Sequence, residues 1–121
     1  MSEPREPGRL TRLCLLEPEF RAKVEALLEW MERLGFDPEV FESLRSSKRQ
    51  EWLYGVGRTH HLRRRPVTWV RYSRHQAGVA VDIVSRRRGW SDPRFFGYLA
   101  RGAGRYGLEA LPHDPCHVQI R

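Results

Sequence analysis

Two short clusters of histidine and aspartate restrict the folds open to this chain, because their side chains can act together only if the fold joins them. The first, residues 73–82, reads S-x-H-x-x-G-x-A-x-D, and the second, residues 113–119, contains D-x-x-H. A catalytic zinc ion usually takes three histidine or carboxylate ligands and leaves its fourth position to water. His75, Asp82 and His117 would supply two imidazoles and one carboxylate. We therefore expect the two clusters to meet at one metal site.

The sequence of the first cluster predicts a loop that leads into a strand. Gly78 permits a close approach of the backbone. From Gly78 to Val84 the residues alternate between two sets, as in a strand whose faces have different tasks. Asp82 would project from one face of this strand, and His75 would reach it from the preceding loop.

In the second cluster, alternation predicts a short strand that buries Cys116 and presents His117 and Gln119 to the site. Asp114 precedes a proline, which favours an extended backbone. A carboxylate three residues before a ligand histidine would lie where a general base is needed. Cys116 is an alternative fourth ligand, although the alternation points its side chain away from His117.

Each of these residues has an ordinary structural explanation when it is taken alone. A single histidine is more often a surface or core residue than a ligand, and a single aspartate in a strand usually lies at an edge or pairs with an arginine. The metal interpretation depends on the joint pattern of the two clusters.

The two motifs together resemble those of the zinc metallopeptidases of the D-alanyl-D-alanine carboxypeptidase and L-alanyl-D-glutamate endopeptidase group, which share a core fold with the hedgehog signalling domain. Upstream, residues 44–59 resemble that group's arginine-serine, glutamine, leucine-tyrosine and glycine-arginine-threonine segment, and a valine-threonine pair follows at 67–68. The resemblance covers residues 40–120 and is nearest to the endopeptidases of phage endolysins and their bacterial relatives.

Carried over to this sequence, the resemblance implies one zinc ion per chain, held by His75, Asp82 and His117, with Asp114 as the catalytic base. Arg45 matches an arginine that contacts the substrate or the developing oxyanion. The implied activity is zinc-dependent hydrolysis of amide bonds in the peptidoglycan stem peptide. An L-alanyl-D-glutamate endopeptidase is favoured, with a D-alanyl-D-alanine carboxypeptidase or a non-catalytic zinc-binding domain as alternatives.

The resemblance also implies supporting residues, since Ser73 and Gln50 match positions that steady the site in the group. Trp90 would either line the substrate groove or cap the core. His113 is a rival to His117 as the last ligand, because some relatives end in histidine-x-histidine. The chain differs from the commoner pattern at Cys116, where proline often precedes the last histidine, and this difference bears on substrate fit more than on metal binding.

The length of 121 residues predicts a single domain, 1–121, without a separate wall-binding domain, and the resemblance implies that it is a zinc peptidase domain. We expect a monomer with a flexible N-terminus at 1–12. Two of the 22 basic residues are lysines and the formal net charge is +7, which favours anionic partners such as wall polymers. A nucleic-acid surface is the alternative from another class, but no specific nucleic-acid motif supports it.

The opening residues contain no apolar run, so we expect no secretory signal and no membrane segment. The product would then begin in the cytoplasm and reach the cell wall after release by a holin or by lysis. The two cysteines, Cys14 and Cys116, are expected to stay unpaired in that compartment.

The remaining pattern predicts helices at 17–34, 47–54 and 92–106, an extended segment at 39–44, a loop at 60–66, a strand at 67–71 and a charged turn at 85–89. Ser47 and Gln50 have the spacing of a capping box, so Gln50 is either a cap or a support of the site. The inward face of the third helix is predicted as Phe96, Leu99, Ala100 and Ala103. This order of elements predicts a small α+β domain whose mainly antiparallel sheet carries the site.

Overall fold

A computed structural model describes residues 3–121 of the chain. In chain order its elements are η1 (Leu13–Leu15), α1 (Pro18–Arg33), β1 (Pro38–Glu42), α2 (Ser47–Gly55), η2 (Arg74–Ala77), β2 (Ala80–Ser85), α3 (Pro93–Arg105), β3 (Leu108–Leu111) and β4 (Asp114–Ile120), where η marks a 3-10 helix. The strands form one antiparallel sheet in the order β1-β2-β4-β3. The predicted α+β class and antiparallel sheet are confirmed.

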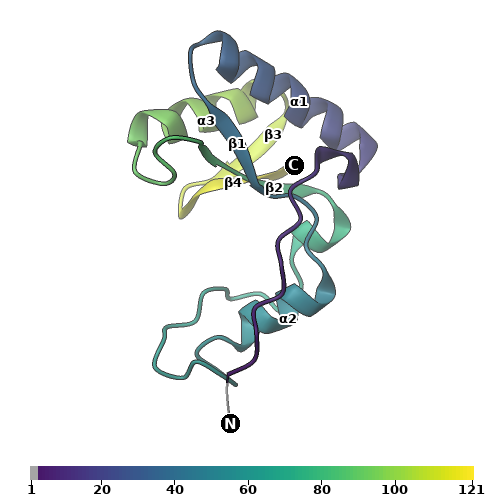
Figure 1. Ribbon diagram of the computed structural model, residues 1–121. Helices are drawn as coiled ribbons and strands as arrows, with labels where there is room; N and C mark the ends of the chain where they lie inside the picture. Colours follow the sequence, from purple (N-terminus) through teal and green to yellow (C-terminus); the bar gives the residue numbers. More distant parts are fainter. Residues whose placement is uncertain (1–2) are drawn as a thin grey trace.

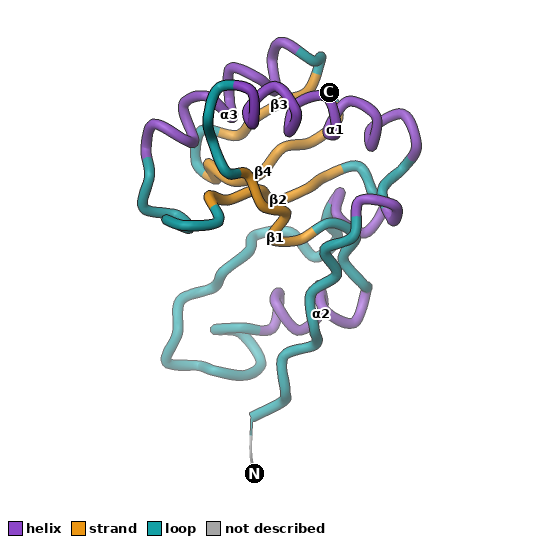
Figure 2. The backbone as a smooth tube through the Cα atoms, turned by 45° about the horizontal axis from the view of Figure 1, so that its top comes forward, coloured by secondary structure: helices purple, strands orange, loops and turns teal. Residues whose placement is uncertain are grey.

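Two layers and an appended lobe make up the molecule. Helices α1 and α3 lie together on one side of the sheet, and α2 lies on the other side with the N-terminal segment and the long loop that follows α2 (Figure 1). The view from a second direction shows the same separation (Figure 2). Within residues 3–121, no helix is both long and apolar enough to cross a bilayer.

Helix α1 begins and ends where the sequence predicts. The Glu17 carboxylate accepts hydrogen bonds from the backbone N–H groups of Glu19 (3.0 Å) and Phe20 (2.8 Å), and Pro18 occupies the first turn. The buried residues of α1 recur every three or four positions and are Phe20, Val24, Leu27 and Met31. This stripe belongs to the hydrophobic core, together with buried residues of the sheet and α3.

The buried face of α3 differs in part from the predicted one: Leu99 and Ala103 are buried as predicted, but the other two residues differ. Asp92 caps the helix as expected, but the buried residues are Phe95, Leu99, Gly102 and Ala103, while Phe96 is half-buried and Ala100 is exposed. Gly102 explains the difference, because a Cβ atom there would collide with Leu27 Cδ1 of α1. The helices cross closely at this glycine, and the face that carries it must be the inner one.

Two local predictions about the region after β1 are wrong. Residues 67–71 form no strand and pair with no strand of the described chain; instead Thr68 Oγ1 accepts a hydrogen bond from Val70 N (3.3 Å), and Trp69 is 82% exposed. An alternating segment without a partner strand cannot satisfy its backbone as a sheet. The N-cap of α2 is Ser46, which accepts from Arg49 N at 3.1 Å, and not Ser47.

Candidate metal centre

His75 is held by the short helix η2, whose sequence encodes both of its ends. Ser73 caps it by accepting from His75 N (3.2 Å), while Gln76 Oε1 accepts from Ser73 N (2.7 Å). Gly78 ends it in the left-handed conformation at φ +72°. The role of Ser73 in the structure is therefore to fix the turn that carries His75.

Asp82 and His117 come from neighbouring strands and are paired directly across the sheet between β2 and β4. Side chains of directly opposite residues project from the same face, so the register alone brings the carboxylate and the imidazole together. His117 Nδ1 lies 3.3 Å from Asp82 Oδ1, and His75 Nε2 lies 3.2 Å from the same oxygen. The two clusters of the sequence thus meet, as predicted.

Hydrogen bonds leave one nitrogen of each imidazole facing Asp82. His75 Nδ1 lies 3.0 Å from the carbonyl oxygen of Ser43, so this nitrogen carries the proton and donates. His117 Nε2 lies 2.8 Å from Gln119 Oε1 and donates in the same way. In both neutral rings the nitrogen nearest Asp82 then has its lone pair free, which is the usual arrangement of metal-binding histidines.

Two buried, unpartnered atoms of the triad indicate that its three side chains fit a zinc ion. His75 Nε2 and Asp82 Oδ1 are buried and lack a hydrogen-bond partner among the described residues, which is costly unless something else satisfies them. Tetrahedral ligands at the usual zinc distances lie about 3.4 Å apart, close to the 3.2 and 3.3 Å found here. The donor set and its spacing both suit a metal of this class.

Charge in the triad follows from the same contacts. Burial raises the pKa of the Asp82 carboxyl, but the proximity of His117 and His75 outweighs it and holds that pKa well below its usual range. Burial lowers the pKa of His117, but its contacts with Asp82 and Gln119 outweigh it and raise that pKa above its usual value. Asp82 is therefore an anion at neutral pH, as a ligand must be.

Asp114 lies at the start of β4, beside the triad but not within it. Its Oδ2 is 4.0 Å from His117 Nδ1, and its side chain is 49% exposed. The thiol of Cys116 donates to Asp114 Oδ1 at 3.6 Å. Cys116 is buried as predicted, and burial followed by the nearby Asp82 charge raises its thiol pKa far above the usual value. Cys116 is not among the residues whose ligand atoms converge with those of the triad.

Arg45 is engaged by protein groups more fully than the sequence implied. It donates to Glu42 Oε1 through Nε (3.1 Å) and Nη2 (2.6 Å) and to Gln50 Oε1 through Nη1 (2.8 Å), and Nη2 lies 3.7 Å from Asp82 Oδ2. Gln50 in turn donates to the carbonyl oxygen of Val70 (2.8 Å). These contacts place Arg45 and Gln50 behind Asp82, between the sheet and the long loop.

Sequence reasoning missed the centre of this network, Glu42. It is 1% exposed and accepts from both Arg45 and Arg49, the latter at 2.6 Å. β1 also pairs Glu42 with Asp82, with a bulge after Val40. No local pattern in the sequence signals this role, since Glu42 ends a strand that is only partly buried.

An open cavity of about 970 Å³ lies over the triad. Its walls include Arg45, Trp90, His113 and Asp114, together with most of the segment 67–74. Trp90 packs edge-on against Phe41 (ring centroids 4.7 Å apart) and lines the cavity, which favours the first of its two predicted roles. His113 lines the cavity but is not among the residues whose ligand atoms converge with those of the triad.

Three solved structures are similar to the chain in fold. The L-Ala D-Glu endopeptidase ChiX of Serratia marcescens is 21% identical, with a TM-score of 0.70 over 94% of this chain and 90% of that one. The vancomycin-resistance D,D-pentapeptidase VanY, solved with Zn(II), is 19% identical, with a TM-score of 0.69 over 87% of this chain and 72% of that one. The LD-carboxypeptidase LdcB is 20% identical, with a TM-score of 0.68 over 87% of this chain; the chain spans 58% of its length.

One of the two sequence comparisons identifies a family. The comparison with curated protein sequences gave no significant match. The model of the family described as VanY, D-alanyl-D-alanine carboxypeptidase, matches residues 14–117, which include the triad and Asp114. The resemblance drawn from the two motifs is confirmed, and the chain belongs to the VanY family of peptidoglycan peptidases.

Proposed function

We propose that this chain is a zinc-dependent peptidase that hydrolyses amide bonds in the stem peptide of peptidoglycan. The observation that carries the proposal is the buried triad at the floor of an open cavity, with the unpartnered atoms His75 Nε2 and Asp82 Oδ1. His75, Asp82 and His117 would hold the ion. Bound there, zinc would polarise the scissile carbonyl and activate water for attack on it.

Asp114 is the proposed general base. Its carboxylate lines the cavity, lies 4.0 Å from His117 Nδ1 and is exposed enough to exchange protons with water. In this position it would take the proton from the attacking water and pass it to the leaving amine. The contact from Cys116 fixes the orientation of the carboxylate without neutralising it.

Arg45 is proposed to act in two ways. Its contacts with Glu42 and Asp82 orient the ligand carboxylate, and the guanidinium also lines the cavity. Since an arginine has five N–H donors and protein groups take only some of them, it can also donate to a carboxylate or oxyanion of the substrate.

Among the stem-peptide bonds, we propose L-alanyl-D-glutamate as the one cleaved. Two features support it: the endolysin-like segment 44–59, and the fit to an L-Ala D-Glu endopeptidase over nearly the whole length of both chains. The family description favours D-alanyl-D-alanine carboxypeptidase as the second candidate. The cavity, open at the surface, admits either an internal or a terminal peptide bond.

Digestion of purified peptidoglycan tests both candidates at once. The protein would be assayed as purified, after chelation, and after zinc restoration, with released fragments identified by mass and by their new amino termini. New N-terminal D-glutamate, or its amide, is expected. Release of free D-alanine would instead assign a carboxypeptidase, and no zinc-dependent release by a folded, zinc-loaded protein would refute the proposed activity.

The proposed place of action is the cell wall, reached after release by a holin or by lysis. Twenty arginines and a net charge of +7 would favour retention on anionic wall polymers. Co-sedimentation with walls that retain or lack their anionic polymers, at low and high salt, would test this part separately from catalysis.

A further inference from the structure

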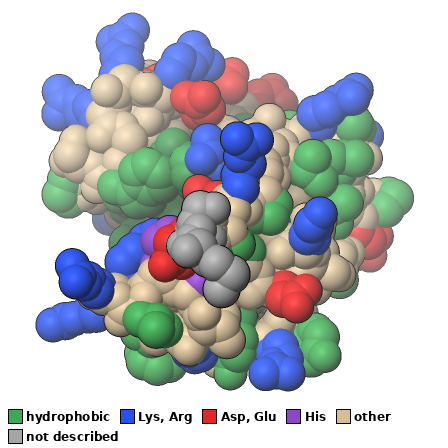
Figure 3. Space-filling model, turned by 60° about the horizontal axis from the view of Figure 1, so that its bottom comes forward, with side chains coloured by type: hydrophobic (Ala, Val, Ile, Leu, Met, Phe, Trp, Pro, Cys, Tyr) green, Lys and Arg blue, Asp and Glu red, His purple; other side chains and the backbone are tan. Residues whose placement is uncertain are grey.

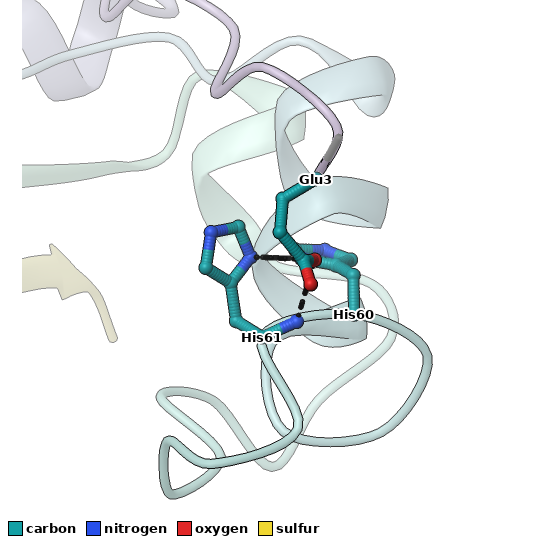
Figure 4. A group of neighbouring side chains, drawn as sticks. All are labelled: Glu3, His60 and His61. Carbon is teal, nitrogen blue, oxygen red and sulfur yellow. Dashed lines mark hydrogen bonds and ion pairs between the residues drawn. The ribbon is translucent and has the colours of Figure 1, made fainter. Parts of the chain in front are cut away.

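A second group of candidate metal ligands lies outside the cavity, where the N-terminal segment meets the loop after α2. Ligand atoms of Glu3, His60 and His61 all lie within 4.8 Å of one another. Figure 4 shows the three side chains converging from two segments far apart in the sequence. In Figure 3, which looks onto this side of the molecule, histidine and acidic side chains appear together at the surface.

His60 is fixed in the manner of a metal-binding histidine. Its Nε2 lies 2.8 Å from the carbonyl oxygen of Trp52, so Nε2 carries the proton and Nδ1 has a free lone pair in the neutral ring. The ring packs against the indole of Trp52, with the two ring centroids 4.9 Å apart. It also covers Gly55, where an added Cβ atom would lie 2.8 Å from His60 Nε2. Both the orientation and the tautomer of His60 are therefore determined by its surroundings.

His61 Nδ1 donates a hydrogen bond to the unprotonated Nδ1 of His60. The two Nδ1 atoms are 2.5 Å apart, and His61 Nδ1 is 3.5 Å from Glu3 Oε2. Among residues 3–121, His61 is the one non-glycine residue with a positive φ, at 45°. Such a conformation costs free energy and persists where the surroundings determine it. Here Glu3 helps to do so, since its Oε2 accepts from His61 N at 2.9 Å.

We propose that Glu3, His60 and His61 form a second zinc site, which clamps the N-terminal segment to the loop after α2. Two imidazoles and a carboxylate suit a zinc-class divalent ion. A cation between the two Nδ1 atoms would replace the proton of the hydrogen bond that joins them. They would separate by about 0.9 Å to reach the ~3.4 Å spacing of tetrahedral ligands, which His61 can supply because it is only half-buried.

The site is structural, because it has no access to the catalytic cavity. None of its three residues is among the described residues that line the cavity. It would complete a series of contacts that already hold the N-terminal segment against α2: Trp52 Nε1 donates to Pro4 O (2.9 Å), and Arg49 Nη1 donates to Pro7 O (3.0 Å). The loop continues from His61 to the cavity wall at Arg64 and Thr68, so the clamp would also steady that wall.

Zinc stoichiometry tests the site without reference to activity. Tag-free wild-type protein, equilibrated by dialysis at micromolar free zinc, is expected to hold two ions per chain. His61→Asn and Glu3→Gln are expected to hold one ion each, because each variant loses a ligand of the second site. Both should keep the fold, since asparagine tolerates a positive φ and glutamine keeps the shape of Glu3. His113→Ala, which removes an exposed histidine at the cavity, is the matched control and should hold two.

Equal stoichiometry in the wild type and in His61→Asn would overturn the proposal. A second ion that binds the wild type only at millimolar zinc would overturn it as well. The His75→Ala variant separates the two sites, because it is expected to lose the ion of the cavity and retain the clamp ion. Hydrogen exchange supplies a second readout: zinc should slow exchange at the amides of residues 5–10 in His75→Ala and leave it unchanged in His61→Asn.

Discussion

At the scale of single residues, a substitution of Asp114 is expected to change catalysis without changing zinc binding or the fold. Asp114→Asn keeps the shape of the side chain and its contact with Cys116 but removes the base. We expect zinc content to be unchanged and kcat to fall by about 10²–10⁴, the usual contribution of a general base. Zinc analysis and peptidoglycan digestion would be measured on the same sample. Glu32→Gln, an exposed carboxylate on α1, is the control, and an active Asp114→Asn protein would remove the assignment.

Glu42 allows a prediction about stability. Glu42→Gln removes the charge that Arg45 and Arg49 share in a nearly solvent-free position. Breaking a buried ion pair from one side costs about 3–5 kcal/mol, so the urea midpoint should fall markedly. Glu29→Gln breaks the exposed pair with Arg33 and should cost less than about 0.5 kcal/mol. Similar losses in the two variants would show that the buried network does not hold the site together.

The spatial convergence of the triad could be predicted from the sequence, while the residues that orient it could not. His75, Asp82 and His117 belong to spaced motifs, and the fold brings them together. Glu42 and the Ser43 carbonyl act through contacts that depend on the path of β1 relative to β2 and η2, which no local pattern records. The assignment of Gln50 to a cap or to the site likewise needed the position of Arg45.

At the scale of elements, replacing either of two glycines of α3 by alanine is expected to change the stability of the protein, in opposite directions. Gly102→Ala would place a methyl group against Leu27 and Trp30 and force α1 and α3 apart, so overpacking of about 1–3 kcal/mol should exceed the helix-propensity gain of about 1 kcal/mol. At Gly97, apart from the adjoining residues and the backbone of the helix itself, no described atom lies within 4 Å of the position that a methyl group would take, so Gly97→Ala should stabilise the protein by up to about 1 kcal/mol. Thermal unfolding of both variants against the wild type measures the sign directly.

Element boundaries followed from caps, and element faces followed from tertiary contacts. Asp92 with Pro93 marked the start of α3, because capping is a local interaction, whereas the range of α1 followed from its apolar periodicity. The inner face of α3 could not be read from apolar residues alone, since Gly102 contributes the closest contact without a side chain. The segment 67–71 has the alternation of a strand, but a strand exists only with a partner.

At the scale of the whole molecule, the metal should contribute to folding as well as to catalysis. The triad joins β2, β4 and η2, and two of its atoms lack a partner within the described chain. An ion that binds only the folded state raises the free energy of unfolding by about 2.7 kcal/mol when its free concentration is 100 times the dissociation constant. Chelation should therefore lower Tm, and zinc should restore it.

The contribution of the triad can be isolated in the His61→Asn background, where the proposed clamp is absent. In that background, chelation should still lower Tm, and adding His75→Ala should abolish the response to zinc because the Asp82 carboxylate would lose one of its two neighbouring imidazoles. Asp114→Asn in the same background should keep the full response, since Asp114 lies outside the ligand group. A Tm that is independent of zinc in the His61→Asn protein would mean that the triad holds its buried atoms without an ion. Loss of the response in Asp114→Asn would instead make Asp114 a ligand and leave the base unassigned.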